Sequence, residues 1–97
     1  MAPLRHVAPG GGVEFEVDPE SGHAAWRVGG RRAGVQRARA VAGDAAVDRI
    51  LRACIRELRG RAVAAGPDGE RLRALAGRLW RERWGQAASQ DAQDRLF

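Results

Sequence analysis

The sequence contains no lysine, asparagine, tyrosine or threonine, and all seventeen of its basic side chains are arginines. Without lysine the chain can form neither a Walker-type phosphate loop nor a Schiff base, so the Gly10–Gly12 run is a linker and not a P-loop. Only two serines are present, and neither Ser21 nor Ser89 lies in a nucleophile-elbow pattern. Lysine, asparagine and tyrosine have AT-rich codons, so their absence is also what a very GC-rich genome produces. The arginine excess therefore has a compositional explanation as well as a functional one.

Residues that bind metals or carry out catalysis are equally scarce. The single cysteine, Cys54, cannot form an internal disulfide, and it cannot complete a zinc set with only His6 and His23. Glu14 and Glu16 point to one face of an expected strand, but a carboxylate pair on an exposed strand has no reason for a shifted pKa. We therefore expect a protein that is not an enzyme, with no cofactor, no metal and no small-molecule substrate.

Long apolar runs are absent too. No segment approaches the roughly 20 apolar residues of a membrane span, and the N-terminus lacks the apolar run of a signal peptide. We expect a cytoplasmic protein with no membrane contact. The 97 residues suffice for one domain with a thin core, which self-association would stabilise.

Alternating apolar and polar residues predict a sheet in the first half of the chain. Residues 1–12, rich in glycine and proline, are interpreted as a flexible lead-in. Three antiparallel strands are predicted at residues 13–17, 23–28 and 31–36. Gly29-Gly30 predicts a tight turn between the last two strands, because both positions of a type I′ turn need positive φ and glycine adopts it.

The predicted strand register also fixes which side chains point to the same face of the sheet. Pairing Phe15 with Trp26 places Val13 beside Val28 and Val17 beside Ala24, apolar with apolar. The tight turn likewise sets Trp26 opposite Ala33 and Ala24 opposite Val35. Trp26 should therefore face the core, and the outer face should align Glu14, Arg27 and Arg32.

The second half has helical periodicity. Helices are predicted at residues 45–64 and 69–86, separated by the breaker Gly66-Pro67-Asp68-Gly69, with Asp44 and Asp68 as capping candidates. Gly60 could end the first helix or be tolerated within it. Residues 87–97 are a tail or a short last helix. The predicted fold class is α+β: a three-stranded antiparallel meander followed by two antiparallel helices packed on one face, with residues 13–86 as the single domain.

Two surfaces could bind a macromolecule. The first is basic and surrounds the predicted hairpin, where residues 21–43 hold five arginines and no acid: Arg27, Arg31, Arg32, Arg37 and Arg39. Arginines on a β-ribbon can neutralise phosphates, and three strands followed by a helix resemble the arm-binding domains of phage integrases and the plant AP2 domains. Such a resemblance implies nucleic-acid binding. Against it, Glu14 and Glu16 share the outer face with Arg27, and Trp26 faces inward.

The second surface lies on the last helix. Leu72, Leu75, Ala76 and Leu79 form one apolar stripe, and Arg73, Gly77, Trp80 and Trp84 form another beside it. The second stripe either packs beneath the sheet, which we favour for Trp80, or binds a partner, for which Trp84 is the better candidate. Trp and Arg dominate binding hot spots. Our leading hypothesis is a small bacterial or phage accessory protein, of inhibitor or adaptor type. It would bind another protein, or itself as a homodimer, through Trp84, Trp80 and Arg73, with Arg27, Arg31 and Arg32 as a polar rim.

Overall fold

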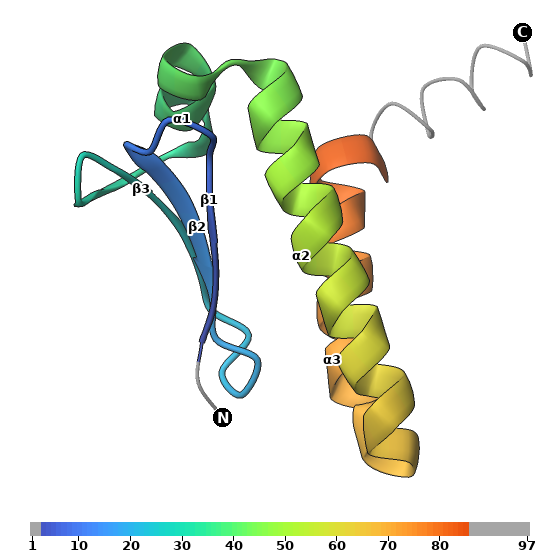
Figure 1. Ribbon diagram of the computed structural model, residues 1–97. Helices are drawn as coiled ribbons and strands as arrows, with labels where there is room; N and C mark the ends of the chain where they lie inside the picture. Colours follow the sequence, from blue (N-terminus) through green and yellow to red (C-terminus); the bar gives the residue numbers. More distant parts are fainter. Residues whose placement is uncertain (1–2, 86–97) are drawn as a thin grey trace, which may run out of the picture.

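A computed structural model describes residues 3–85 as an α+β fold in which a four-stranded antiparallel sheet carries helices on one face (Figure 1). The strand order is β1-β2-β3-β4. The strands are β1 (Leu4–Val7), β2 (Val13–Val17), β3 (Ala24–Val28) and β4 (Arg31–Ala33), and the helical segments are α1 (Val35–Ala42), α2 (Asp44–Ala65), η1 (Gly66–Gly69), α3 (Glu70–Trp80) and η2 (Arg81–Gly85). The predicted class is confirmed, with one strand and one α-helix more than predicted.

Strands β2 and β3 pair in the predicted register. Phe15 lies opposite Trp26, and Val13 lies opposite Val28. The Phe15 and Trp26 rings pack with their centroids 4.5 Å apart, and both side chains are buried beneath the helices. Burial of one face and solvation of the other is what the alternating sequence requires.

The Gly29-Gly30 turn also forms, with both glycines at positive φ, and it sets Trp26 opposite Ala33 as predicted. The predicted strand over residues 31–36 is wrong beyond Ala33, because Val35 begins α1 instead of pairing with Ala24. Helix α1 buries Ala38 completely. Its Ala-rich sequence favours helix over strand once the strand pairing ends.

The interpretation of residues 1–12 as a flexible lead-in is wrong for Leu4–Val7, which form β1 along the edge of β2. Leu4 lies opposite Val17, and it is buried. The Gly10–Gly12 run lies in the β1–β2 turn, where all three glycines have positive φ.

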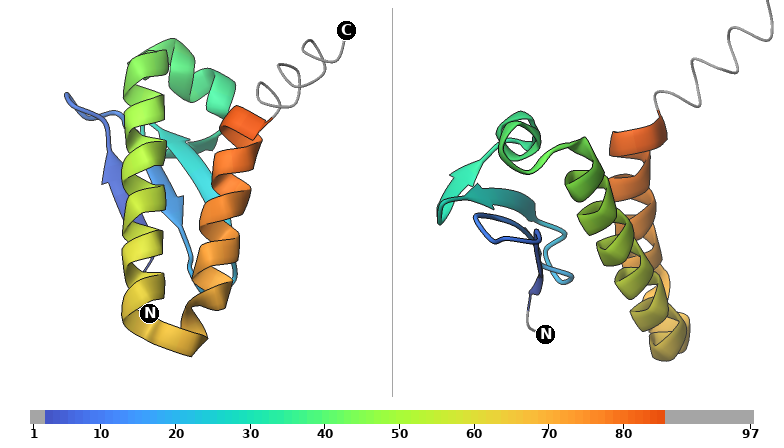
Figure 2. Two further views of the ribbon diagram at one scale, coloured as in Figure 1. Left: turned by 90° about the vertical axis from the view of Figure 1, so that its right-hand side faces the viewer. Right: turned by 45° about the horizontal axis from the view of Figure 1, so that its top comes forward.

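Helices α2 and α3 form an antiparallel hairpin that covers the inner face of the sheet (Figure 2). The apolar stripe of α2 is buried and includes Val47, Ile50, Leu51, Cys54, Leu58 and Ala62. Gly60 lies within α2, and the predicted breaker forms the 3₁₀ turn η1. Neither Asp44 nor Asp68 makes the predicted capping hydrogen bond, because α2 and α3 begin after Gly43 and Gly69. The predicted tail, residues 87–97, lies outside the described residues.

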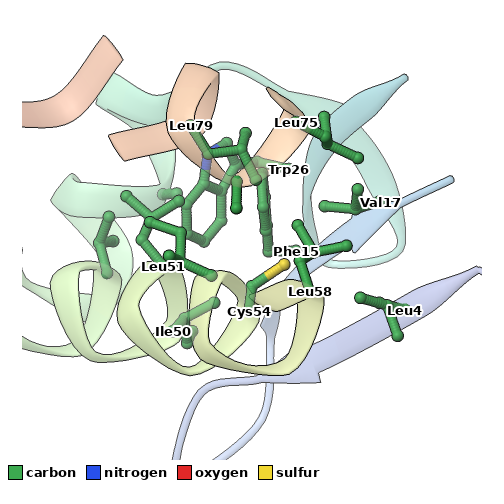
Figure 3. Packing of buried hydrophobic residues seen from close by; sticks show 14 of the residues in the cluster. Leu4, Phe15, Val17, Trp26, Ile50, Leu51, Cys54, Leu58, Leu75 and Leu79 are labelled. Carbon is green, nitrogen blue, oxygen red and sulfur yellow. The ribbon is translucent and has the colours of Figure 1, made fainter. Parts of the chain in front are cut away.

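The core lies between the sheet and this hairpin (Figure 3). Cys54 points into it as a free, fully buried thiol. At the edge of the core, His6 of β1 faces inward and contacts Glu57 of α2, with 3.0 Å between Nε2 and Oε2. Within residues 3–85, no helix combines the length and hydropathy of a membrane-spanning segment.

Candidate protein-binding surface

The two tryptophans of the second stripe lie together at the end of the helical hairpin. Trp80 is the last residue of α3, and Trp84 lies in the following turn η2, with ring centroids 6.1 Å apart. Trp80 is 41% exposed, whereas Trp84 is half-buried and packs against the core. The expectation that Trp80 packs beneath the sheet is therefore wrong. Leu72, Leu75, Ala76 and Leu79 already fill that side of α3, and the tryptophan stripe lies on the flank towards α2.

Trp84 lies close to two guanidinium groups. The Arg52 carbon Cζ, from α2, lies 5.3 Å from the centroid of the Trp84 ring, and the Arg83 Cζ lies 5.6 Å from it. Both distances are within the range of a cation–π interaction. Sequence reasoning missed Arg52, because its contact with Trp84 depends on how α2 and α3 cross.

An ion pair between the helices holds Arg83 in place. Arg83 donates from Nε to Asp48 Oδ1 at 2.6 Å and from an Nη nitrogen to Asp48 Oδ2 at 3.0 Å. This bidentate geometry is the strong form of an arginine–carboxylate interaction. Hydrogen bonding to Asp48 raises the pKa of the Arg83 guanidinium above its ordinary value. The ion pair joins α2 to η2, which is a short π-helical segment.

We expect Asp48→Asn to destabilise the protein by about 1–2 kcal/mol, because it removes the charge from a half-buried, bidentate pair. Equilibrium unfolding in urea measures this loss. Glu82→Gln is the matched control, because the Glu82–Arg78 pair is exposed, one helical turn apart and 3.7 Å long, and should contribute almost nothing. Equal losses in the two variants would show that the Asp48–Arg83 pair does not hold η2.

A row of arginines runs along α2 beside the tryptophans. Arg49, Arg52, Arg56 and Arg59 are exposed and, at spacings of three and four residues, share one helix face. The other charged pairs of α2 are already formed: Asp48 binds Arg83, and Glu57 accepts a hydrogen bond from Arg61. Between Arg49, Arg52 and Arg56 lies a shallow hollow of about 490 Å³.

Arg73 lies on the stripe of α3 that also carries Trp80 and leads to Trp84. Ala62 packs against Gly69 at one end of the hairpin, and Arg52 contacts Trp84 at the other. Arg59 precedes Ala62 by about one turn, and Arg73 follows Gly69 by about one turn, so antiparallel pairing places them at the same level. We call this face the Trp–Arg surface. It consists of the half-buried Trp84 and six exposed residues: Trp80, Arg49, Arg52, Arg56, Arg59 and Arg73.

The structure separates the arginines of the predicted hairpin from this surface. Arg27 and Arg32 lie opposite each other on the sheet face away from buried Trp26 and the helices, so they cannot form a rim around Trp80 and Trp84. Arg27 lies 3.6 Å from the carboxylate of Glu16, and Arg32 donates to the ring of His23 at 2.8 Å. Arg31, at the tip of the hairpin, is exposed.

Helix α1 carries the last two candidates for phosphate binding. Arg37 is exposed, whereas Arg39 is largely covered and lies 3.9 Å from Asp44. The predicted alignment of Glu14 with Arg27 and Arg32 is also present. Glu14 and Glu16 both pair with Arg5, at 3.9 and 3.6 Å, so acids and arginines alternate over the open sheet face. This face therefore lacks the uniform positive charge of a phosphate-binding surface.

Comparison of the chain with models of protein families, with curated proteins and with solved structures finds no match. Among residues 3–85, no three His, Cys, Asp or Glu side chains cluster in a way that could hold a metal ion. The geometry of the surface itself must therefore support any proposal about function.

Proposed function

We propose that this protein is a small, non-catalytic binding module that uses the Trp–Arg surface to bind an acidic face of another protein. The observation that carries the proposal is the arrangement at the end of the hairpin. An exposed tryptophan, Trp80, lies beside a second one, Trp84, which contacts two guanidinium groups, and a row of further arginines extends from there along α2.

The residue types and the fixed positions of their side chains both support binding. Trp and Arg are the residues most enriched among interface hot spots. Fixing a long side chain on binding costs about 0.5–1.5 kcal/mol, and an interface loses less when its side chains are already positioned. Here Trp84 packs on the core, and Asp48 fixes Arg83 with two hydrogen bonds. Part of the surface is thus ordered before a partner arrives.

Charge complementarity favours an acidic partner over a second copy of the chain. In a symmetric dimer through this surface, the arginine rows of the two copies would face each other at close range. Two acids of α2, Asp48 and Glu57, already lie within 4 Å of an arginine of the same chain. Like charges at an interface disfavour a pairing, and opposite charges raise the association rate.

The test uses Trp80→Ala, Arg52→Ala and the control Arg31→Ala. All three side chains are exposed, so each variant should fold, and far-ultraviolet circular dichroism checks this. Partners captured by the wild-type protein from nuclease-treated lysate of the source cells are purified, and their affinities are measured by isothermal titration calorimetry. We expect Trp80→Ala and Arg52→Ala to weaken binding about tenfold or more, and Arg31→Ala to leave it unchanged.

Three results would contradict the proposal. Loss of all captured material on nuclease treatment, with Arg31→Ala weakened most, would favour nucleic-acid binding by the hairpin. A wild-type dimer in light scattering that Trp80→Ala converts to a monomer would show self-association instead. Equal affinity of all three variants for the captured protein would place its binding site elsewhere.

A further inference from the structure

A pocket opens where α1, α2 and the end of α3 meet the sheet. Its volume is about 240 Å³. Most of its wall is apolar and comes from Phe15, Trp26, Leu51 and Leu79. Figure 3 shows these side chains converging between the sheet and the helices. Arg39 of α1 adds a cation to this wall.

One nitrogen of the Arg39 guanidinium, Nε, is buried and has no hydrogen-bond partner among residues 3–85. The Asp44 carboxylate oxygen lies 3.9 Å from that Nε, too far for a hydrogen bond. Leaving a buried donor unpaired costs about 1–3 kcal/mol, and more for a charged group, so native structures rarely do so without a reason.

A second donor lies in the same wall. The indole N–H of Trp26 forms no hydrogen bond within residues 3–85, and Trp26 lines the pocket together with Leu79. The other charged groups in the pocket wall are Arg83, which binds Asp48, and Glu82, whose carboxylate lies 3.7 Å from Arg78. Within the described residues, the pocket wall thus combines the Arg39 guanidinium, the Trp26 indole and an apolar surface.

We propose that this pocket binds a small organic acid. The acid would carry one carboxylate, which binds Arg39 and the indole N–H of Trp26, on a single aromatic ring or a similar apolar group. The size fits, because an engineered cavity of about 150 Å³ already holds benzene, and 240 Å³ leaves room for the carboxylate as well. The cationic donor selects an anion over a neutral molecule of the same shape. This site is independent of the proposed protein-binding function.

The test is a titration with phenylacetate, followed by ¹H–¹⁵N nuclear magnetic resonance. The chain has three tryptophans, so only three indole N–H signals appear, and Trp80→Phe and Trp84→Phe assign the Trp26 signal by elimination. We expect phenylacetate to shift the Trp26 signal saturably, with a dissociation constant in the millimolar range that is usual for a ligand of this size. Phenylacetamide has the same shape without the charge, and its affinity should be lower by about tenfold or more.

Variants of α1 complete the test. Arg39→Gln should weaken phenylacetate binding about tenfold or more, and Arg37→Gln, which changes an exposed arginine of the same helix, should not. If Arg39→Gln does not fold, the comparison of phenylacetate with phenylacetamide on the wild-type protein still tests the proposal. No saturable shift of the Trp26 signal, equal affinity for the two compounds, or equal loss in the two variants would each overturn the proposal.

Discussion

Replacing Gly69 by alanine should destabilise the protein by about 3 kcal/mol or more, the upper part of the range for overpacking a tight contact. A Cβ atom at this position would lie 2.1 Å from the carbonyl oxygen of Ala62 and 2.7 Å from its carbonyl carbon. Both are backbone atoms of α2 that cannot rotate away. The end of the α2–α3 hairpin would therefore have to open, and with it the packing of Leu72 against the core.

Gly60→Ala is the matched control and should have the opposite sign. Gly60 lies inside α2, and a Cβ there meets nothing within 4 Å. Alanine in a helix interior is favoured over glycine by about 0.5–1 kcal/mol, so this variant should be more stable than the wild type. Denaturant unfolding followed by circular dichroism measures both changes. Similar stabilities of the two variants would show that Gly69 does not set the approach of the helices.

This pair of glycines marks a limit of sequence-based prediction. The composition of residues 66–69 predicts a break between two helices, and the break is there. The requirement for glycine at position 69 comes from the backbone of Ala62, which only the folded hairpin brings close. Local turn chemistry is readable from sequence, whereas a tertiary approach is not.

Strand β1 was not predictable, because it contradicts the alternation that identifies strands. His6 lies on the inner face, and Val7 lies on the outer face with 56% of its surface exposed. The inward histidine is accommodated by Glu57, which is 51 residues further along the chain. A short edge strand with a polar residue inside and an apolar one outside has no period-two signal.

The candidate site was predicted in part, and for a similar reason. The periodicity of α3 identifies Arg73, Trp80 and Trp84 as one stripe, which the structure places on one flank of the helix. It cannot show that Trp84 meets Arg52 or that Asp48 fixes Arg83, because these contacts depend on the crossing of two helices. The pocket likewise depends on α1, where Val35 and Gln36 continue the alternation of a strand but fold as a helix.

The second large effect concerns pH, and the unusual composition makes it measurable. Burial raises the pKa of the Cys54 thiol from 9.0 to about 11, with a further contribution from the negative charge of Glu57. The chain has no lysine and no tyrosine, and its arginines ionise only above about pH 12. Cys54 is therefore the one side chain of this sequence that should titrate between pH 9 and pH 11.

The direction of the effect follows from linkage. In the unfolded chain the thiol loses its proton near its ordinary pKa, whereas the folded protein keeps it until about pH 11. The unfolded state is thus favoured as the pH rises through this window. The free energy of unfolding should fall by about 1.4 kcal/mol per pH unit, or roughly 2–3 kcal/mol in all. Unfolding in guanidinium chloride at pH 8 and at pH 11 measures the loss.

Cys54→Ala is the control for this experiment. The variant should be less stable than the wild type at pH 8, because it removes a fully buried sulfur from the core, but its stability should change little up to pH 11. The two proteins would then converge in stability as the pH rises. An equal loss in the variant would show that the alkaline transition does not arise from Cys54. A flat profile in the wild type would show that the folded thiol ionises as readily as the unfolded one, through water reaching the core beside Glu57.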